Sequence, residues 1–258
     1  MSPEVSTAAP VRGLSPRAAV LRAEARLFRR EAGSLFWTLG FPPLLLVILG
    51  SIRSFRKFDE GLGMRVIDVY VPTLVLVALI VTGLQAMPPV ITGYRERGIL
   101  RRMSLTPVRP SELLIAQMGL NGAAGVLSAL VCLTIGRLAF DVQLPKQAVG
   151  YALAFLLTVT AALALGALIS ALAPTARLAS GIGMVVFFPS LFSAGLWAPV
   201  QSMPHTLREI VVLLPFGAAS QALEQAAAGH WPDWSHLGVL SAWAVVLTAA
   251  AARWFRWE

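Results

Sequence analysis

The sequence has few of the residues that disulfides, metal sites and soluble surfaces require. It contains a single cysteine, Cys132, which excludes an intrachain disulfide and a cysteine-based metal site. Asp, Glu, Lys and Arg together make up 13% of its 258 residues, which is about half the share in an average soluble domain. Apolar residues make up 57%, and the mean hydropathy is +0.72. These values indicate a protein that lies in a lipid bilayer.

Lysine is scarce, and its positions bear on catalysis. The two lysines, Lys57 and Lys146, do not follow the glycine pattern of a phosphate-binding loop, so we predict that this chain does not hydrolyse ATP and is not an enzyme. The sequence has no nucleophile motif, and its apolar segments have no paired carboxylates, so we predict no catalytic residue. Segment 230–236 holds two histidines and an aspartate, but its two tryptophans favour a membrane-surface belt, and we predict no metal site.

Six apolar runs are long enough to cross a bilayer, which takes about 20 helical residues. The sequence therefore predicts an all-α polytopic membrane protein, with a transmembrane domain over residues 34–258. In the third run Gly119, Gly122 and Gly125 predict close helix packing. The runs are Ser34–Ile52, Val66–Ile91, Leu113–Phe140, Ala148–Ala173, Ala179–Trp197 and His236–Trp254.

Ahead of the first run, residues 1–14 are expected to be disordered and residues 15–33 to form an amphipathic interfacial helix. Arg22, Arg26 and Arg29 share one face of this helix, and apolar side chains occupy the other. Glu24 and Glu31 depart from the pattern, since both fall in the apolar face. They could pair with polar groups of the bundle or face a partner protein. An ordinary basic flank of the first span is the alternative.

The net charge of +8 comes from residues at the ends of the runs, which argues for membrane topology and against nucleic-acid binding. Placing both termini in the cytoplasm puts fourteen of the 21 Lys and Arg residues on the cytoplasmic side. Arg53, Arg56, Lys57 and Arg65 are exceptions in the first external loop. This topology predicts a multi-pass protein of the cytoplasmic membrane.

A basic loop at residues 93–112 joins the second and third spans. Its five arginines alternate with apolar residues in a pattern that predicts a short amphipathic helix, ended by Pro107. Such a compact element could receive a push from a soluble motor protein. A topogenic loop with no partner is the alternative.

Several residues of this loop carry a resemblance to the type-2 ABC exporter permeases, namely Glu96, Gly98, Leu100, Leu105, Thr106, Pro107 and Val108. The resemblance implies a coupling helix that docks on a separate ABC ATPase subunit. It also implies an interfacial elbow helix and an external re-entrant helical segment at 198–235, where Gly195–Pro199 and Leu214-Pro215 match. Carried over by position, the docking residues are Glu96, Arg97, Gly98, Leu100, Arg101, Arg102, Thr106 and Pro107.

The resemblance further implies a function. Two copies, expected as a homodimer, would export an amphipathic drug, antibiotic or lipid-like metabolite across a bacterial membrane and so contribute to drug resistance. ATP and Mg would bind the partner subunits, and this chain would hold no cofactor. Export of a polysaccharide or lipid-linked glycan is an alternative substrate class. A non-transporting membrane assembly protein is an alternative of another class. A secondary transporter or channel is a third possibility, although this sequence has no Asp or Glu near a span midpoint that could bind a proton or a sodium ion.

Polar and aromatic side chains inside the spans are the candidates for the translocation path. Gln85 and Asn121 could line it, although hydrogen bonding between helices is the other use of such residues. By resemblance, Phe187, Phe188 and Phe192 could form an apolar constriction at a dimer interface, with ordinary packing as the alternative.

Overall fold

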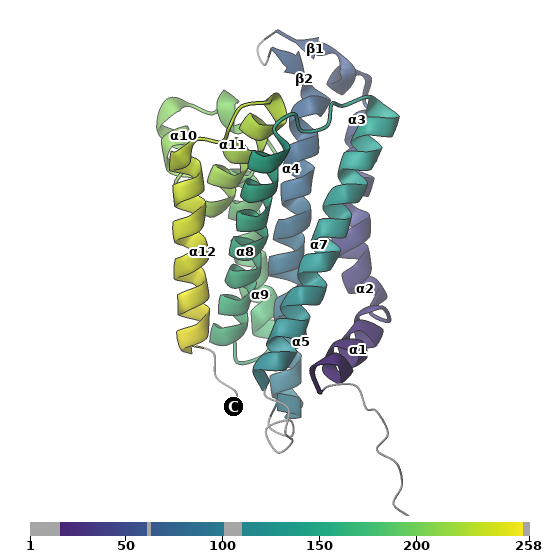
Figure 1. Cartoon of the computed structure of the whole chain (residues 1–258), viewed down its shortest axis with the longest axis vertical. Coiled ribbons are helices and arrows are strands. Elements are labelled where there is room, and N and C mark those ends of the chain that lie inside the picture. The colour runs from purple at the N-terminus through teal and green to yellow at the C-terminus, as the bar shows by residue number, and fades with distance from the viewer. Residues whose placement is uncertain (1–15, 61–62, 101–109, 255–258) are drawn as a thin grey trace, which may run out of the picture.

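The computed structural model describes residues 16–60, 63–100 and 110–254. Within them, six helical segments are long and apolar enough to cross a bilayer, as predicted, so the protein is an all-α polytopic membrane protein (Figure 1). The N-terminal helix α1 (Pro16–Phe28) lies at the same end of the bundle as the C-terminal ends of α5 (Met87–Glu96) and α12 (Trp234–Trp254) (Figure 1). The segments are Gly33–Ser51, Val66–Glu96, Leu113–Phe140, Ala148–Leu172, Ala176–Ser193 and Trp234–Trp254.

The first span has three parts: α2 (Ala32–Leu35), a π-helical turn η1 (Phe36–Gly40) and α3 (Phe41–Ser51). The fifth span, α9 (Ala176–Ser193), begins and ends about three residues earlier than predicted. The hydroxyl of Thr175 accepts a hydrogen bond from the Leu178 amide at 3.2 Å and caps the helix start. At the other end, Gly195 adopts a left-handed φ of 84°, which ends the helical path.

The second span runs through the centre of the bundle. It consists of α4 (Val66–Val81), a π-helical turn η3 (Thr82–Ala86) and α5 (Met87–Glu96), and 89% of its most apolar stretch is buried. A Cβ atom on Gly166 of α8 (Ala148–Leu172) would lie 2.1 Å from the Gly83 carbonyl oxygen, so the two backbones are in direct contact. By contrast, the predicted glycine series is used only in part: Gly125 packs tightly on Leu79, whereas Gly119 faces open space.

The other spans surround this centre. They are the first span, α7 (Pro110–Phe140), α8, α9 and α12, with α8 packed against α12 and α4 against α7. At the opposite end from α1 lie η2 (Arg53–Arg56), an unpredicted hairpin of β1 (Phe58–Asp59) and β2 (Met64–Arg65), and η4 (Val200–Ser202) (Figure 1). There α10 (His205–Val211) and α11 (Pro215–Ala228) meet at a 100° bend, consistent with the predicted re-entrant segment.

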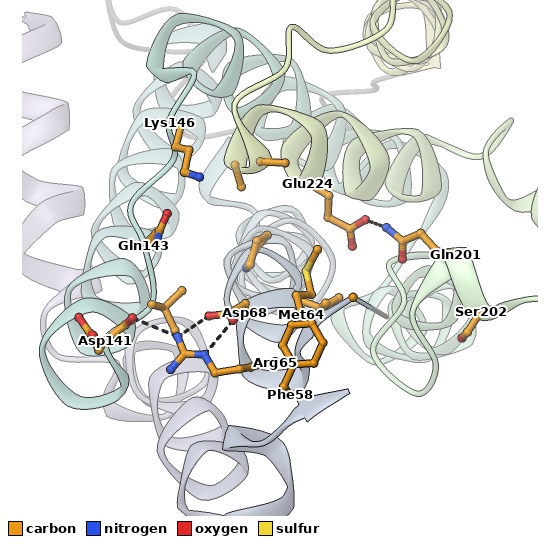
Figure 2. Close-up of a pocket in the computed structure, with 16 residues that line it drawn as sticks. Phe58, Met64, Arg65, Asp68, Asp141, Gln143, Lys146, Gln201, Ser202 and Glu224 are labelled. Atoms are coloured by element: carbon orange, nitrogen blue, oxygen red, sulfur yellow. Dashed lines mark hydrogen bonds and ion pairs between the residues drawn. The ribbon is translucent and has the colours of Figure 1, made fainter. Parts of the chain in front are cut away.

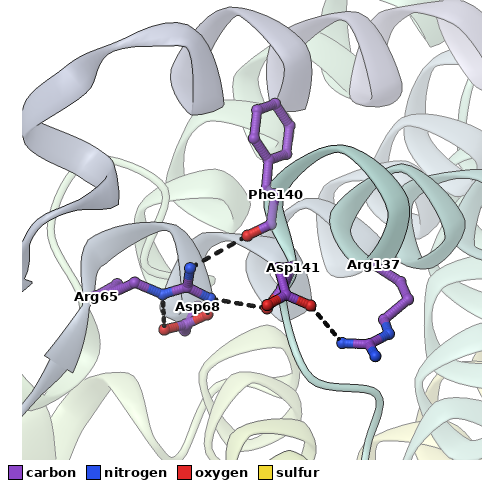
Figure 3. Close-up of polar contacts among 5 residues, drawn as sticks. All are labelled: Arg65, Asp68, Arg137, Phe140 and Asp141. Carbon is purple, nitrogen blue, oxygen red and sulfur yellow. Dashed lines mark hydrogen bonds and ion pairs between the residues drawn. The ribbon is translucent and has the colours of Figure 1, made fainter.

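Two of the arginines that depart from the positive-inside pattern have structural contacts at the hairpin end of the bundle. Arg65 forms a bidentate pair with Asp68, with distances of 2.9 and 2.7 Å, and also donates to the backbone carbonyls of Phe140 and Asp141 (Figure 3). Arg56 lies 5.1 Å from the centre of the Phe140 ring. Arg65 thus holds the end of α7 against the start of α4, and Arg56 packs on the last ring of α7, which gives both cations of this loop a structural role.

Candidate functional site

The basic loop begins with a tight turn at the end of α5. The Arg97 amide donates to the Gly93 carbonyl at 3.2 Å, and the Gly98 amide donates to that of Arg95 at 2.9 Å. Gly98 has a φ of 63°, the left-handed conformation that ends many helices. No atom of the described residues lies within 4 Å of a Cβ placed there, so it is this conformation that favours glycine. Glu96 and Arg97 are exposed at the turn.

Only part of the predicted docking segment is described. Leu100 is 2% exposed and packs with Tyr94 and Leu113, so its side chain anchors the loop to the bundle and does not face solvent. Arg101, Arg102, Thr106 and Pro107 lie outside the described residues. The assignment of the eight residues to ATPase docking stays a prediction.

A buried carboxylate links the helices on both sides of this loop to the elbow helix. Glu24 on α1 is 7% exposed. Its Oε2 atom accepts a hydrogen bond from the Tyr94 hydroxyl of α5 at 2.9 Å and one from the Gln117 Nε2 of α7 at 2.6 Å. The sequence signalled Glu24 as an acid within an apolar face, but it gave no sign of Tyr94 or Gln117.

Cationic side chains fix the end of α5 to further elements. Arg95 Nη1 donates to the carbonyls of Ser170 and Ala173 at 3.0 and 2.9 Å, where the C-terminal end of α8 favours positive charge. Arg97 lies 5.6 Å from the centre of the Tyr94 ring. Partial burial raises the pKa of Glu31, the charge of Glu24 raises this pKa further, and the charge of Arg97 lowers it.

A cleft of about 550 Å³ opens beside the contact between Arg95 and the end of α8. It is lined by Arg95, Glu96, Leu172, Pro174 and Trp254 among others. It brings together the ends of α5, α8 and α12, which are far apart in sequence. The exposed Glu96 therefore lies at the edge of a concave surface.

The candidate path residues occupy two different environments. Gln85 lies in the π-helical turn η3, and its Nε2 atom is buried with no hydrogen-bond partner among the described residues. Asn121 is 1% exposed and donates to the Gln117 carbonyl on its own helix at 2.9 Å. Phe188 and Phe192 are 53% and 38% exposed on α9, with Phe187 partly buried beside them. Their role in translocation stays a prediction.

Across the described ranges, no group of three or more His, Cys, Asp or Glu side chains is placed to hold a metal ion. The end of the bundle at α1 therefore combines an exposed turn, a cleft beside it and a buried polar link among three helices.

Comparison with protein-family models gives a match over residues 51–253 to a family described as ABC-2 family transporter protein. No curated protein matches the sequence. The match covers five of the six spans, the loop after the second span and the bent α10–α11 pair. Such a family member is a multi-pass membrane component, is not itself an enzyme and works with an ABC ATPase partner. The chain belongs to the ABC-2 transporter family and is an ABC permease.

Proposed function

We propose that this permease exports an amphipathic small molecule, such as a drug, an antibiotic or a lipid-like metabolite, across the cytoplasmic membrane of a bacterium. Two copies form a homodimer and dock two ATPase subunits, which bind ATP and Mg. The docking residues, in the basic loop at residues 93–112, are Glu96, Arg97, Gly98, Leu100, Arg101, Arg102, Thr106 and Pro107. Family membership supports the transporter half of this proposal, and the inner end of the bundle supports the coupling half.

The observation that carries the proposal is the link from Glu24 to Tyr94 and Gln117. Tyr94 lies just before the loop and Gln117 lies just after it, so a force on the loop reaches both flanking helices and α1 together. Arg95 extends the connection to the end of α8. Packed elements joined in this way move as a unit, which is what transmission from a motor requires.

The test is co-purification with the partner ABC ATPase, followed by measurement of ATP hydrolysis in lipid nanodiscs. Glu96→Ala removes an exposed carboxylate at the start of the loop. Glu60→Ala is the matched control, because Glu60 is equally exposed in the hairpin at the opposite end.

We expect Glu96→Ala to lower the amount of bound ATPase and the permease-dependent hydrolysis about tenfold, the effect of losing one charged interface contact. Glu60→Ala should match the wild type. Normal docking and normal hydrolysis by Glu96→Ala would remove the basis for the coupling assignment. A chain that binds no ATPase at all would favour a membrane assembly protein.

A further inference from the structure

A cavity of about 760 Å³ lies at the outer end of the bundle, between the hairpin, the loop that joins α7 to α8, and α11 (Figure 2). Its volume falls in the range of sites that take drug-sized ligands. Phe58 and Met64 line it, and both are exposed, at 66% and 41%. The cavity therefore combines apolar surface with the charged groups around it.

Two of the three carboxylates that line the cavity are already neutralised. Asp68 is held in the bidentate pair with Arg65. Asp141 pairs with Arg137, which donates from Nη1 at 2.7 Å (Figure 3). The Arg65 guanidinium also donates to two backbone carbonyls, so it has little capacity left for an anionic ligand.

Glu224 on α11 is the third carboxylate. It accepts a hydrogen bond from the Gln201 amide (Figure 2). It also accepts hydrogen bonds from the Gln221 amide and the Ser220 hydroxyl, so all three donors are uncharged. Within the described residues it has no cationic partner. Burial raises the pKa of Glu224 to about 7, as expected for a carboxylate whose charge is not balanced.

Lys146 does not supply that balance. Its side chain packs on Gly229, at the C-terminal end of α11, and its amide donates to the Ala227 carbonyl. Among the described residues, the ammonium group of Lys146 forms no ion pair with Glu224. The charges at the cavity thus leave one oriented carboxylate without a counter-ion.

We infer that the outer cavity binds an organic cation, with Glu224 as its counter-ion and with Phe58 and Met64 against its apolar part. An aromatic ring face attracts such a cation, which adds to the charge pairing. The site would hold the exported compound on its release side, and in that respect the inference rests on the proposed function. The substrate class that the site selects is therefore a cationic amphipathic compound.

The ionisation of Glu224 gives the binding a pH dependence. A cation binds the ionised carboxylate, and with a pKa of about 7 the ionised fraction rises about tenfold between pH 6 and pH 8. Arg65, Asp68, Asp141 and Lys146 also face the cavity. Affinity should rise with pH in the wild type and stay flat in Glu224→Gln, which isolates the contribution of Glu224.

The test measures equilibrium binding of radiolabelled tetraphenylphosphonium to the full chain in nanodiscs, with empty nanodiscs subtracted. Tetraphenylborate is the matched probe, since it has nearly the same shape and the opposite charge. We expect one saturable site for the cation and none for the anion. Glu224→Gln should weaken binding about tenfold, and Glu209→Gln, an exposed glutamate of α10, should not.

Phe58→Ala provides a second variant that leaves the fold intact, because this side chain is mostly exposed. Its expected loss is about two- to fivefold, the size of an exposed cation–π contact. The inference is overturned if Glu224→Gln and Phe58→Ala both bind the cation with wild-type affinity, or if the wild type binds the anion more tightly than the cation. The assay contains no ATPase, so a negative result here with normal ATPase docking rejects the cation site and leaves the proposed function standing.

Discussion

Tyr94 donates a hydrogen bond of 2.9 Å to Glu24, a residue 70 positions earlier in the chain. This contact joins the elbow helix to the last turn of the second span, directly before the loop that we propose docks on the ATPase. Both side chains are almost fully buried. A buried carboxylate depends on its donors, so the pair should be sensitive to the loss of either partner.

Tyr94→Phe removes one of the two donors of Glu24 and leaves the ring in place. We expect the free energy of unfolding to fall by about 1.5–3 kcal/mol, the usual value for a hydrogen bond to a charged group. ATP hydrolysis in the complex should fall as well. Tyr70→Phe is the control, since this buried tyrosine packs on Phe55 at the outer end. Equal thermal stability of the two variants would show that the Glu24 contact contributes little.

Gly98→Ala tests the turn that starts the loop. A side chain in the left-handed conformation costs about 1–2 kcal/mol. The substitution should redirect the loop and reduce ATPase co-purification with little change in overall thermal stability. Gly63→Ala is closely matched, because Gly63 has a φ of 67° and open space around it at the opposite end of the molecule. Similar loss of ATPase in both variants would argue against a role specific to Gly98.

Gly166→Ala tests the backbone contact at the centre of the bundle. The new methyl group would lie 2.1 Å from the Gly83 carbonyl oxygen, so α8 and the π-helical turn must separate. We expect a destabilisation of about 3 kcal/mol, the upper part of the range for overpacked cores. Gly181→Ala adds the same group in open space on α9 and should be neutral. Thermal unfolding in detergent measures both; a neutral Gly166→Ala would contradict the packing described.

Cross-linking tests the proposed homodimer. Val185 is 74% exposed and shares a face of α9 with Phe188 and Phe192, the predicted constriction. In a Cys132→Ala background, Val185→Cys should form a covalent dimer on oxidation in membranes. Val245→Cys on α12 is equally apolar and 68% exposed, and should remain monomeric. Cross-linking through Val245 instead of Val185 would place the dimer interface on another face.

The spans could be predicted from the sequence because apolar length is a local property of the chain. The link from Glu24 to Tyr94 could be predicted only in part. Glu24 stood out as an acid on an apolar face, but its partner Tyr94 lies far away in sequence. The contact between Gly83 and Gly166 was missed for the same reason, whereas the regular series that includes Gly119 predicted more contact than exists. Helix register and π-helical turns depend on tertiary packing, which local patterns do not encode.

The outer cavity shows the same limit. Asp68 and Glu224 are both visible as acids in an apolar sequence, yet only the structure shows that Arg65 neutralises the first and that the second has neutral donors alone. Charge pairing between elements far apart in the chain decides which acid is available to a ligand.

The most direct test of the central claim is ATP-driven transport by the permease with its ATPase in inside-out membrane vesicles. The account predicts that a fluorescent amphipathic cation accumulates inside the vesicles when ATP and Mg are added outside. Accumulation should stop when the ATPase carries an alanine in place of its phosphate-binding lysine. Accumulation that continues with that ATPase variant, or none with the intact complex and a panel of amphipathic cations, anions and neutral compounds, would contradict it.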